Sequence, residues 1–186
     1  MNLIVTDLAS QETASIKSFA AHDVEFTIGG CALGKVLVAR SPIGVCAILF
    51  DSTAEKTEQD LAASFPGNRI VLNNRRLRAD LTKILQFIAV PYDPIDLDLD
   101  IRGTPFQRRV WDGLRTIAFG KPLTYAQLAR RVSGPKSLRA IALACAENPI
   151  ALAIPCHRVM GHSGSGAGYR WGIERKQALI NKETAT

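Results

Sequence analysis

The sequence predicts a mixed fold, α/β of the α+β kind, with a small sheet and helices in its first half and mostly helices in its second. Two observations lead to this prediction: a strand pattern on either side of residue 42, and helical spacing with matching end signals after residue 100. The chain has 186 residues, 47% of them hydrophobic, which suffices for one ordinary domain or two small domains that share a core.

The first half contains a predicted hairpin. Apolar segments at residues 35–39 and 45–50 flank the sequence SPIG at residues 41–44. Proline and glycine there occupy positions that a tight turn favours. We therefore expect two antiparallel strands joined by this turn, as the centre of a small sheet.

Two helices are expected to follow the hairpin. Ser52 and Glu55 have the spacing of a capping box, which would begin a helix that ends at Pro66-Gly67. Apolar residues then recur at helical spacing over 77–88, before Pro91 ends the pattern. This half of the chain is interpreted as structural support.

The segment 94–101, PIDLDLDI, alternates strictly between apolar and acidic residues. Such alternation predicts a strand with one buried face. The composition changes at this point, so we expect the boundary between two domains here. The predicted domains are residues 1–99 and residues 100–186.

The second half opens with Thr104 as N-cap and Pro105 in the first helical position, and Gly120 is expected to close that helix. A second helix should begin after Thr124, turn at Ser-Gly-Pro near residue 134, and lead into a third helix over 137–147. Two short helices joined by a tight turn that contains glycine are typical of a helix-turn-helix.

Charge is divided unevenly between the two halves. Residues 1–100 hold nine Lys/Arg and 13 Asp/Glu, a net charge of −4, whereas residues 101–186 hold 14 and four, a net charge of +10. A basic second half indicates a polyanionic partner, most simply nucleic acid bound through its phosphates. A solvated basic surface with no partner is the alternative that charge alone leaves open.

The cysteine pattern excludes two kinds of site. Cys31, Cys46 and Cys145 lie in apolar segments and are assigned to the core. No CxxC pair is present, so neither a zinc ribbon nor a disulfide framework is expected. The sequence also shows no targeting segment and no apolar run of membrane-spanning length. Together these features predict reduced thiols and a cytoplasmic protein.

Cys156 is the candidate nucleophile. It follows an apolar run between two prolines and precedes a glycine-rich loop, so we expect it where a strand opens into a pocket. A free thiol has a pKa near ~8.5, and His157 and Arg158 are groups that could lower it. Adjacent residues on a strand point in different directions, so these residues alone are equally compatible with a buried structural thiol.

The segment IPCHRV, preceded by Asn-Pro and followed by a glycine-rich loop and GYRWG, resembles the active-site signature of the O6-alkylguanine-DNA alkyltransferases. The resemblance extends from about Ile101 to Glu183, through RGTPFQRRVW, LTYAQLA and GPKSLRAIALACAENP, and is strongest toward the C-terminal half of bacterial adaptive-response proteins. It implies a ribonuclease-H-like first half and a winged-helix-like second half. Four clustered zinc-binding cysteines of those proteins have no counterpart here, so methyl-triggered transcriptional activation is not expected.

The resemblance implies a role for each catalytic residue. Cys156 attacks the alkyl carbon, His157 takes the thiol proton directly or through water, and Glu183 orients the charged histidine. Tyr125 donates its phenolic proton toward guanine N3, although an aromatic residue at a helix start is otherwise most simply a core contact. Asn148 braces the active-site segment from beneath.

The same resemblance implies how the damaged base is bound. The backbone carbonyls of Cys156 and Val159 accept hydrogen bonds from the guanine amine. The backbone N–H of Arg170, which follows Tyr169, faces O6. These contacts depend on the glycine-rich loop at 161–168 closing over the base.

The third helix of the second half is expected to face DNA. Its small residues and single large cation form a smooth surface without base-reading side chains, which suits a minor groove rather than major-groove readout. The resemblance places Arg139 as the cation that fills the gap left by an extruded base. The residues expected to face the groove with it are Ser137, Leu138, Ala140 and Ala142.

The predicted function is direct reversal of DNA damage. The chain would flip O6-alkylguanine out of double-stranded DNA from the minor-groove side and transfer the alkyl group irreversibly to Cys156. It would act once, as a monomer, without cofactor or metal. Two alternatives are a helix-turn-helix module that binds DNA without chemistry, and a thiol hydrolase that turns over many substrate molecules.

Overall fold

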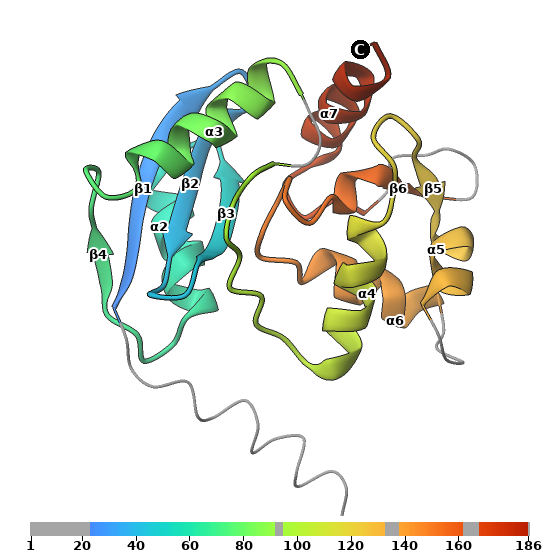
Figure 1. The fold of residues 1–186 in the computed structure, drawn as a ribbon, viewed down its shortest axis with the longest axis horizontal. Helices are drawn as coiled ribbons and strands as arrows, with labels where there is room; N and C mark the ends of the chain where they lie inside the picture. The colour runs from blue at the N-terminus through green and yellow to red at the C-terminus, as the bar shows by residue number, and fades with distance from the viewer. Residues whose placement is uncertain (1–22, 92–94, 133–137, 162–167, 186) are drawn as a thin grey trace, which may run out of the picture.

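The computed structural model describes residues 23–91, 95–132, 138–161 and 168–185. Its main sheet has four strands in the order β3-β2-β1-β4 (Figure 1). β2 pairs antiparallel with both β3 and β1, whereas β1 and β4 run parallel. The strands are β1 (Val24–Cys31), β2 (Gly34–Arg40), β3 (Val45–Asp51) and β4 (Ile70–Leu72).

The predicted hairpin is confirmed as β2 and β3. The N–H of Ser41 donates to the carbonyl of Gly44 across the turn at 2.9 Å. Every residue of β3 from Val45 to Phe50 is buried. Successive strand residues point to opposite faces, so both faces of this strand are covered.

Two helices pack against the sheet, α2 (Ala54–Ser64) on β2 and β3 and α3 (Arg78–Ala89) on β1. Both predicted helices are confirmed, but the predicted start of α2 is wrong. Thr53 is the N-cap and accepts from the Lys56 N–H, because the backbone N–H and hydroxyl of Ser52 are both bonded to the carboxylate of Asp51.

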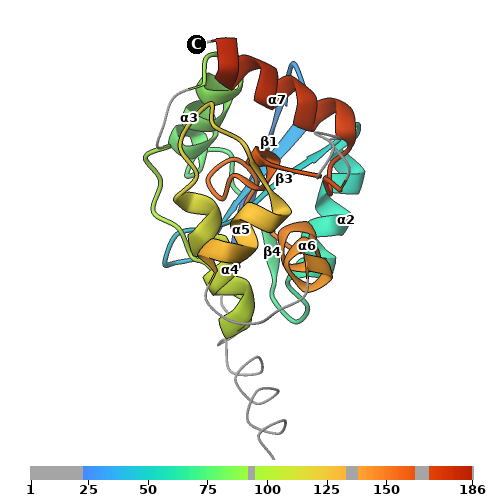
Figure 2. The same ribbon diagram turned by 90° about the vertical axis from the view of Figure 1, so that its right-hand side faces the viewer.

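The second half is mostly helical and lies beside β3, opposite β4 (Figures 1 and 2). A short parallel pair joins two of its segments, β5 (Leu123–Thr124) and β6 (Val159–Met160). None of the helices in the described ranges has the length and apolar character needed to cross a membrane. The helices are α4 (Pro105–Arg115), α5 (Tyr125–Arg131), α6 (Leu138–Ala146) and α7 (Ile173–Ala185).

The predicted helix starts in this half are confirmed. Thr104 and Thr124 are N-caps with complete capping boxes, formed with Gln107 and Gln127. The predicted end of the first helix is wrong, because α4 stops at Arg115 instead of continuing to Gly120. The predicted turn near residue 134 and the first residue of the third helix, Ser137, lie outside the described residues.

The segment after residue 94 is not the strand that its alternation predicts. Leu99 makes a single bridge to Val45. The backbone N–H of Val45 donates to the carbonyl of Asp98, and the N–H of Asp100 donates to the carbonyl of Val45. The expected alternation of burial is present only in part: Asp96 and Asp98 are exposed, whereas Asp100 is buried and accepts from Ser41 and Arg102. The segment does not extend along β3, because the next part of that edge is occupied by Ile150, which bridges to Ile48.

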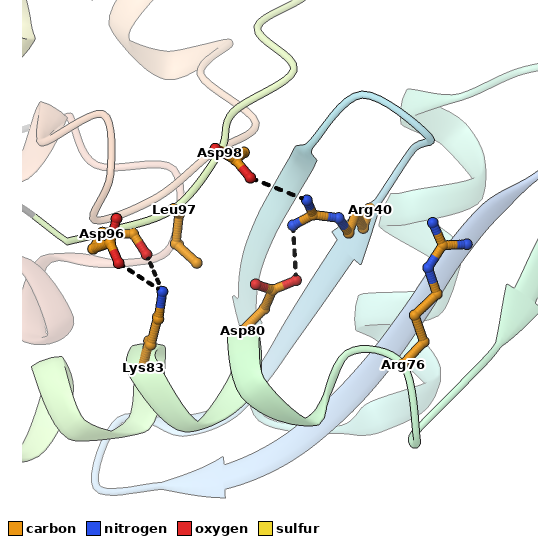
Figure 3. A pocket seen from close by; sticks show the side chains of 7 residues that line it. All are labelled: Arg40, Arg76, Asp80, Lys83, Asp96, Leu97 and Asp98. Atoms are coloured by element: carbon orange, nitrogen blue, oxygen red, sulfur yellow. Dashed lines mark hydrogen bonds and ion pairs between the residues drawn. The ribbon is translucent and has the colours of Figure 1, made fainter.

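Ion pairs fasten this segment to the first half. Arg40 contacts Asp80 at 3.1 Å and Asp98 at 3.5 Å, and Lys83 contacts Asp96 at 2.9 Å (Figure 3). These side chains line a polar pocket of about 450 Å³. Because Asp96 and Asp98 are mostly exposed, each of the two pairs that they form contributes at most about 1 kcal/mol.

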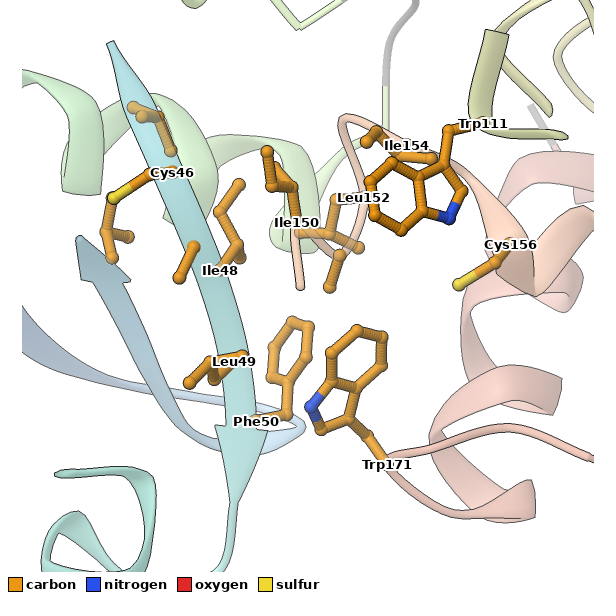
Figure 4. Packing of buried hydrophobic residues seen from close by; sticks show 14 of the residues in the cluster. Cys46, Ile48, Leu49, Phe50, Trp111, Ile150, Leu152, Ile154, Cys156 and Trp171 are labelled. Carbon is orange, nitrogen blue, oxygen red and sulfur yellow. The ribbon is translucent and has the colours of Figure 1, made fainter. Parts of the chain in front are cut away.

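The buried apolar residues of the two halves form one continuous cluster. Ile150, Leu152 and Ile154 lie between β3 and Trp111, and Cys156 is at the far side of this group (Figure 4). The rings of Phe50 and Trp171 meet edge to face at 6.2 Å. The sheet therefore supports the segment that carries the candidate nucleophile. The division of the chain into two domains at residue 99 stays a prediction.

Candidate active site

Cys156 is the first residue of a short 3₁₀ turn, η1 (Cys156–Arg158). The expectation of a strand opening into a pocket is wrong, because residues 151–154 form turns, and Leu152 has a φ of 68°. Leucine rarely adopts this left-handed conformation, so the surrounding packing must impose it. Cys156 itself is only 4% exposed.

Asn148 links the end of α6 to the thiol. Its side-chain amide donates to the carbonyl of Ile154 at 2.9 Å and to Sγ of Cys156 at 3.2 Å. Its Oδ1 accepts from the backbone N–H of Ile150 at 2.9 Å. The residue is fully buried, so all three bonds are shielded from water. Asn148 thus fixes the turns before Cys156 and supplies a donor to its sulfur.

His157 is held by Glu183 of α7. Nε2 of the imidazole lies 2.7 Å from Oε1 of the carboxylate, and both side chains are buried. Arg158 donates to Oε2 at 2.8 Å and to Oε1 at 3.2 Å, and its other terminal nitrogen donates to the carbonyl of Ile117 at 2.8 Å. Sequence reasoning treated Arg158 only as a cation near the thiol, whereas here it fixes the carboxylate.

The protonation states of this pair follow from burial and charge. Burial lowers the pKa of His157 more strongly than Glu183 raises it. Burial would raise the pKa of Glu183, but the hydrogen bonds and charges of His157 and Arg158 outweigh it and lower that pKa. At neutral pH the pair is therefore a neutral imidazole beside a carboxylate. Nε2 is the protonated nitrogen, because the carboxylate can only accept.

The second ring nitrogen of His157 is unprotonated in this state. Nδ1 of His157 has no hydrogen-bond partner among the described residues, and it is buried. Burial raises the pKa of Cys156 to about 11, against the opposing effects of Asn148 and Lys176. The resting site therefore holds a thiol, and forming the nucleophile requires a proton acceptor. Nδ1 has the protonation state needed for that task.

Lys176 is a site residue that sequence reasoning missed. It is fully buried in the first turns of α7, and its Nζ has no hydrogen-bond partner within the described ranges. Burial lowers the pKa of Lys176, whereas the Cys156 and Cys145 thiolates would raise it. Its spacing of seven residues from Glu183 was an available signal, since that spacing puts both on one face of a helix.

Comparison with known proteins agrees with this arrangement. A family model described as "6-O-methylguanine DNA methyltransferase, DNA binding domain" matches residues 105–185. The chain is 39% identical over 160 residues to the bifunctional transcriptional activator/DNA repair enzyme Ada of Escherichia coli, covering 86% of this chain and 45% of that protein. It is 35% identical over 150 residues to a probable methylated-DNA–protein-cysteine methyltransferase of Acanthamoeba polyphaga mimivirus, covering 80% and 96%. The chain belongs to the methylated-DNA–protein-cysteine methyltransferase family.

Solved structures support the same assignment. The O6-methylguanine methyltransferase of Mycobacterium tuberculosis matches with a TM-score of 0.74 and 30% identity over 87% of this chain and 93% of that one. M. tuberculosis OGT in complex with DNA matches with a TM-score of 0.74 and 30% identity, covering 87% and 94%. The chain spans about half the length of the two Ada proteins it matches, at 45% of each.

In this methyltransferase-family chain, Tyr125 begins α5 and faces the same site. Its hydroxyl donates to the carbonyl of Gly168 at 3.2 Å, and Nζ of Lys176 lies 6.0 Å from the centre of its ring. Burial, with the Cys145 and Cys156 thiols, raises the pKa of Tyr125 to about 12. The phenol therefore stays protonated and remains a donor near neutral pH.

The three residues expected to bind the base lie in two places. Val159 is buried in β6, where it pairs with Leu123. Tyr169 packs edge to face on Trp171 with ring centres 5.2 Å apart, and its buried hydroxyl has no partner in the described part of the chain. Arg170 is exposed and lies over the Trp171 ring at 5.7 Å.

The surface of α6 carries the residues expected to meet DNA. Leu138 and Arg139 are exposed, Ala140 and Ala142 are half-buried, and Ser137 lies outside the described residues. Arg139 is the single cation of α6, as expected, but the set of residues expected to face the groove omitted Leu143, which is also exposed. Its fourth-residue spacing from Arg139 was the signal that would have identified it.

Proposed function

We propose that this chain repairs O6-alkylguanine in double-stranded DNA by moving the alkyl group onto Cys156. The observation that carries the proposal is a buried thiol that accepts a hydrogen bond from Asn148 and is followed in the chain by His157, whose neutral imidazole donates to Glu183. Arg158 in turn fixes the Glu183 carboxylate. Membership of the methylated-DNA–protein-cysteine methyltransferase family supports this reaction.

The duplex approaches α6 through its minor groove. The net charge of +10 on residues 101–186 favours phosphate contacts, and the family model's DNA-binding domain spans this region. Arg139 enters the stack and occupies the space of the extruded nucleotide, at a cost of a few kcal/mol for unstacking. Binding the extruded base beside Cys156 offsets that cost. We propose a winged-helix-like arrangement for this half and a ribonuclease-H-like arrangement for the first half.

Transfer begins with removal of the thiol proton. His157 accepts this proton at Nδ1, directly or through one water molecule, while its other nitrogen donates to Glu183. The resulting imidazolium is stabilised by the carboxylate, which has a lowered pKa and is already ionised. Asn148 donates to the sulfur as its negative charge develops.

The sulfur then attacks the alkyl carbon. A carbon–sulfur bond forms as the bond between that carbon and O6 breaks, and negative charge passes to the guanine. Tyr125 donates a hydrogen bond to N3 of this leaving group, because its raised pKa keeps it protonated. The carbonyls of Cys156 and Val159 accept from the guanine amine, and the backbone N–H of Arg170, after Tyr169, faces O6.

The product is a thioether on Cys156, and no step of this scheme regenerates the thiol. The chain therefore acts once, with a stoichiometry of one alkyl group per molecule. The scheme uses side-chain and backbone groups alone and needs no cofactor. The monomeric state and the cytoplasmic setting stay sequence-based predictions.

Mass spectrometry tests this proposal directly. The chain is mixed with a duplex that contains O6-methylguanine, and intact and peptide masses are followed. We expect an increase equal to one CH2 group, confined to the Cys156 peptide and saturating at one per chain. Cys145→Ser is a matched control, since that thiol is also buried and should leave the transfer intact.

Other outcomes would favour the alternatives. Repeated turnover with an unmodified chain at the end would indicate a thiol hydrolase. DNA binding without any change in mass, and equal behaviour of Cys156→Ala, would indicate a binding module without chemistry. Either result would reject the transfer reaction.

A further inference from the structure

Three large side chains of α6 are exposed, Leu138, Arg139 and Leu143, and the last two lie one helical turn apart. Arg139 is exposed, and Leu143 is 58% exposed, whereas the opposite face buries Ile141, Ala144 and Cys145 in the core. Residues four positions apart on a helix have their Cβ atoms about 5–6 Å from each other. Arginine and leucine therefore project from the same strip of this surface.

The surroundings of Leu143 on its helix are small. Ala142 and Ala146 are its neighbours on the outer face, so the leucine projects above them, and the other exposed leucine of the helix, Leu138, lies five residues before it. Residues 138–146 include no acidic side chain, and Glu147, just beyond them, is hydrogen-bonded to Gln107 of α4. The strip thus combines a cation and an apolar projection, followed one turn later by the carboxylate of Glu147, which accepts from Gln107.

We propose that Leu143 is an apolar wedge that enters the minor groove of the duplex together with Arg139. This inference rests on the proposed function, which places the duplex against α6. Minor-groove proteins insert leucine and similar side chains between base steps and widen or kink the groove. Neighbouring base pairs are about 3.4 Å apart, so Leu143 meets the duplex about two steps from the nucleotide that Arg139 replaces.

The two side chains favour the opened duplex through different interactions. Arg139 is attracted by phosphates and fills the gap in the stack, whereas Leu143 gains only when its exposed surface leaves water. Burying a leucine side chain is worth enough to change an equilibrium by tenfold or more. The wedge therefore favours the opened duplex over the closed one and has no contact with an isolated modified base.

The test compares two substrates for the variant Leu143→Ala. Alkylation of Cys156 is timed with a duplex containing O6-methylguanine and with free O6-benzylguanine. We expect the duplex reaction to slow by about tenfold and the free-base reaction to stay unchanged. Alanine is the best helix former, so the substitution preserves α6. Leu72→Ala is the matched control, because Leu72 is 59% exposed on β4, in the other half of the chain.

Three results would overturn the wedge. The duplex reaction of Leu143→Ala could match that of the unchanged chain, both substrates could slow equally, or Leu72→Ala could give the same loss. A second measurement distinguishes failure of the wedge from failure of the proposed chemistry: fluorescence anisotropy gives the Kd for an unmodified duplex, which does not depend on alkyl transfer. If the unchanged chain never alkylates Cys156, the proposed function fails, whereas a tenfold weaker Kd for Leu143→Ala alone still supports the wedge.

Discussion

Opposite charges meet in two regions of this molecule, with different consequences. In the first half, Asp96 and Asp98 pair with Lys83 and Arg40 at the surface, where the aspartates are 94% and 85% exposed. In the second half, Glu183 is 4% exposed and holds both His157 and Arg158. Water screens the surface pairs but not the buried ones, so only the buried group can fix the protonation state of a neighbour.

The largest effect is expected from breaking the buried group. Glu183→Gln leaves the arginine buried without its counter-charge and replaces the carboxylate, whose two oxygens accept from His157 and Arg158, by a neutral amide with one acceptor oxygen. We expect a loss of about 3–5 kcal/mol in the free energy of unfolding, measured by urea denaturation, together with loss of alkyl transfer. A variant with unchanged stability and transfer would contradict the role of this carboxylate.

A smaller effect on rate, with the opposite effect on stability, is expected at Lys176. Lys176→Met keeps the length of the side chain but removes a buried ammonium group that has no hydrogen-bond partner in the described residues. Stability should stay equal or rise, because the desolvation cost of the charge disappears.

The same variant should make Cys156 harder to ionise. The charge of Lys176 lowers the pKa of this thiol, so its removal raises the pKa further above about 11. We expect alkylation of Cys156 by a small electrophile to be about tenfold slower at neutral pH. The pH at which the alkylation rate rises should also be higher. Lys176→Arg, which retains the charge, is the control. A pH profile shifted toward lower pH would contradict this electrostatic role.

The smallest effect is expected from breaking a surface pair. Asp98→Asn removes one contact of Arg40, which keeps its bond to Asp80. The free energy of unfolding should change by at most about 1 kcal/mol, and transfer to Cys156 should be unaffected. A loss of unfolding free energy as large as that of Glu183→Gln would mean that exposure to water does not explain the difference between the surface pairs and the buried group.

Local signals predicted the elements well. The N-caps Thr104 and Thr124 bond to an N–H three residues away, and the hairpin turn closes between Ser41 and Gly44. Such contacts need no distant partner, so the sequence specifies them. The prediction failed at residues 94–101, because whether that alternating segment forms a strand depends on which other segment occupies the edge of β3.

The candidate site was predicted only in part for the same reason. The motif identified Cys156, and the resemblance assigned His157, Glu183 and Asn148, which the structure brings together. The buried position of Lys176 and the exposure of Leu143 were missed. Spacing along the helix puts each on the same face as a predicted residue, but whether that face is buried or exposed depends on how α6 and α7 pack.

The sequence by itself determined the starts of the helices capped by Thr104 and Thr124, the hairpin and the basic second half, and it singled out Cys156 as the candidate nucleophile. Tertiary structure alone decided that this thiol is buried, that its base is neutral and that a lysine lies near it. The physical reason is the distance along the sequence between the groups that interact. Caps and turns are closed by neighbours along the chain, whereas pKa values are set by burial and by charges such as Glu183, which lies 26 residues from His157 in sequence and 2.7 Å from it in space.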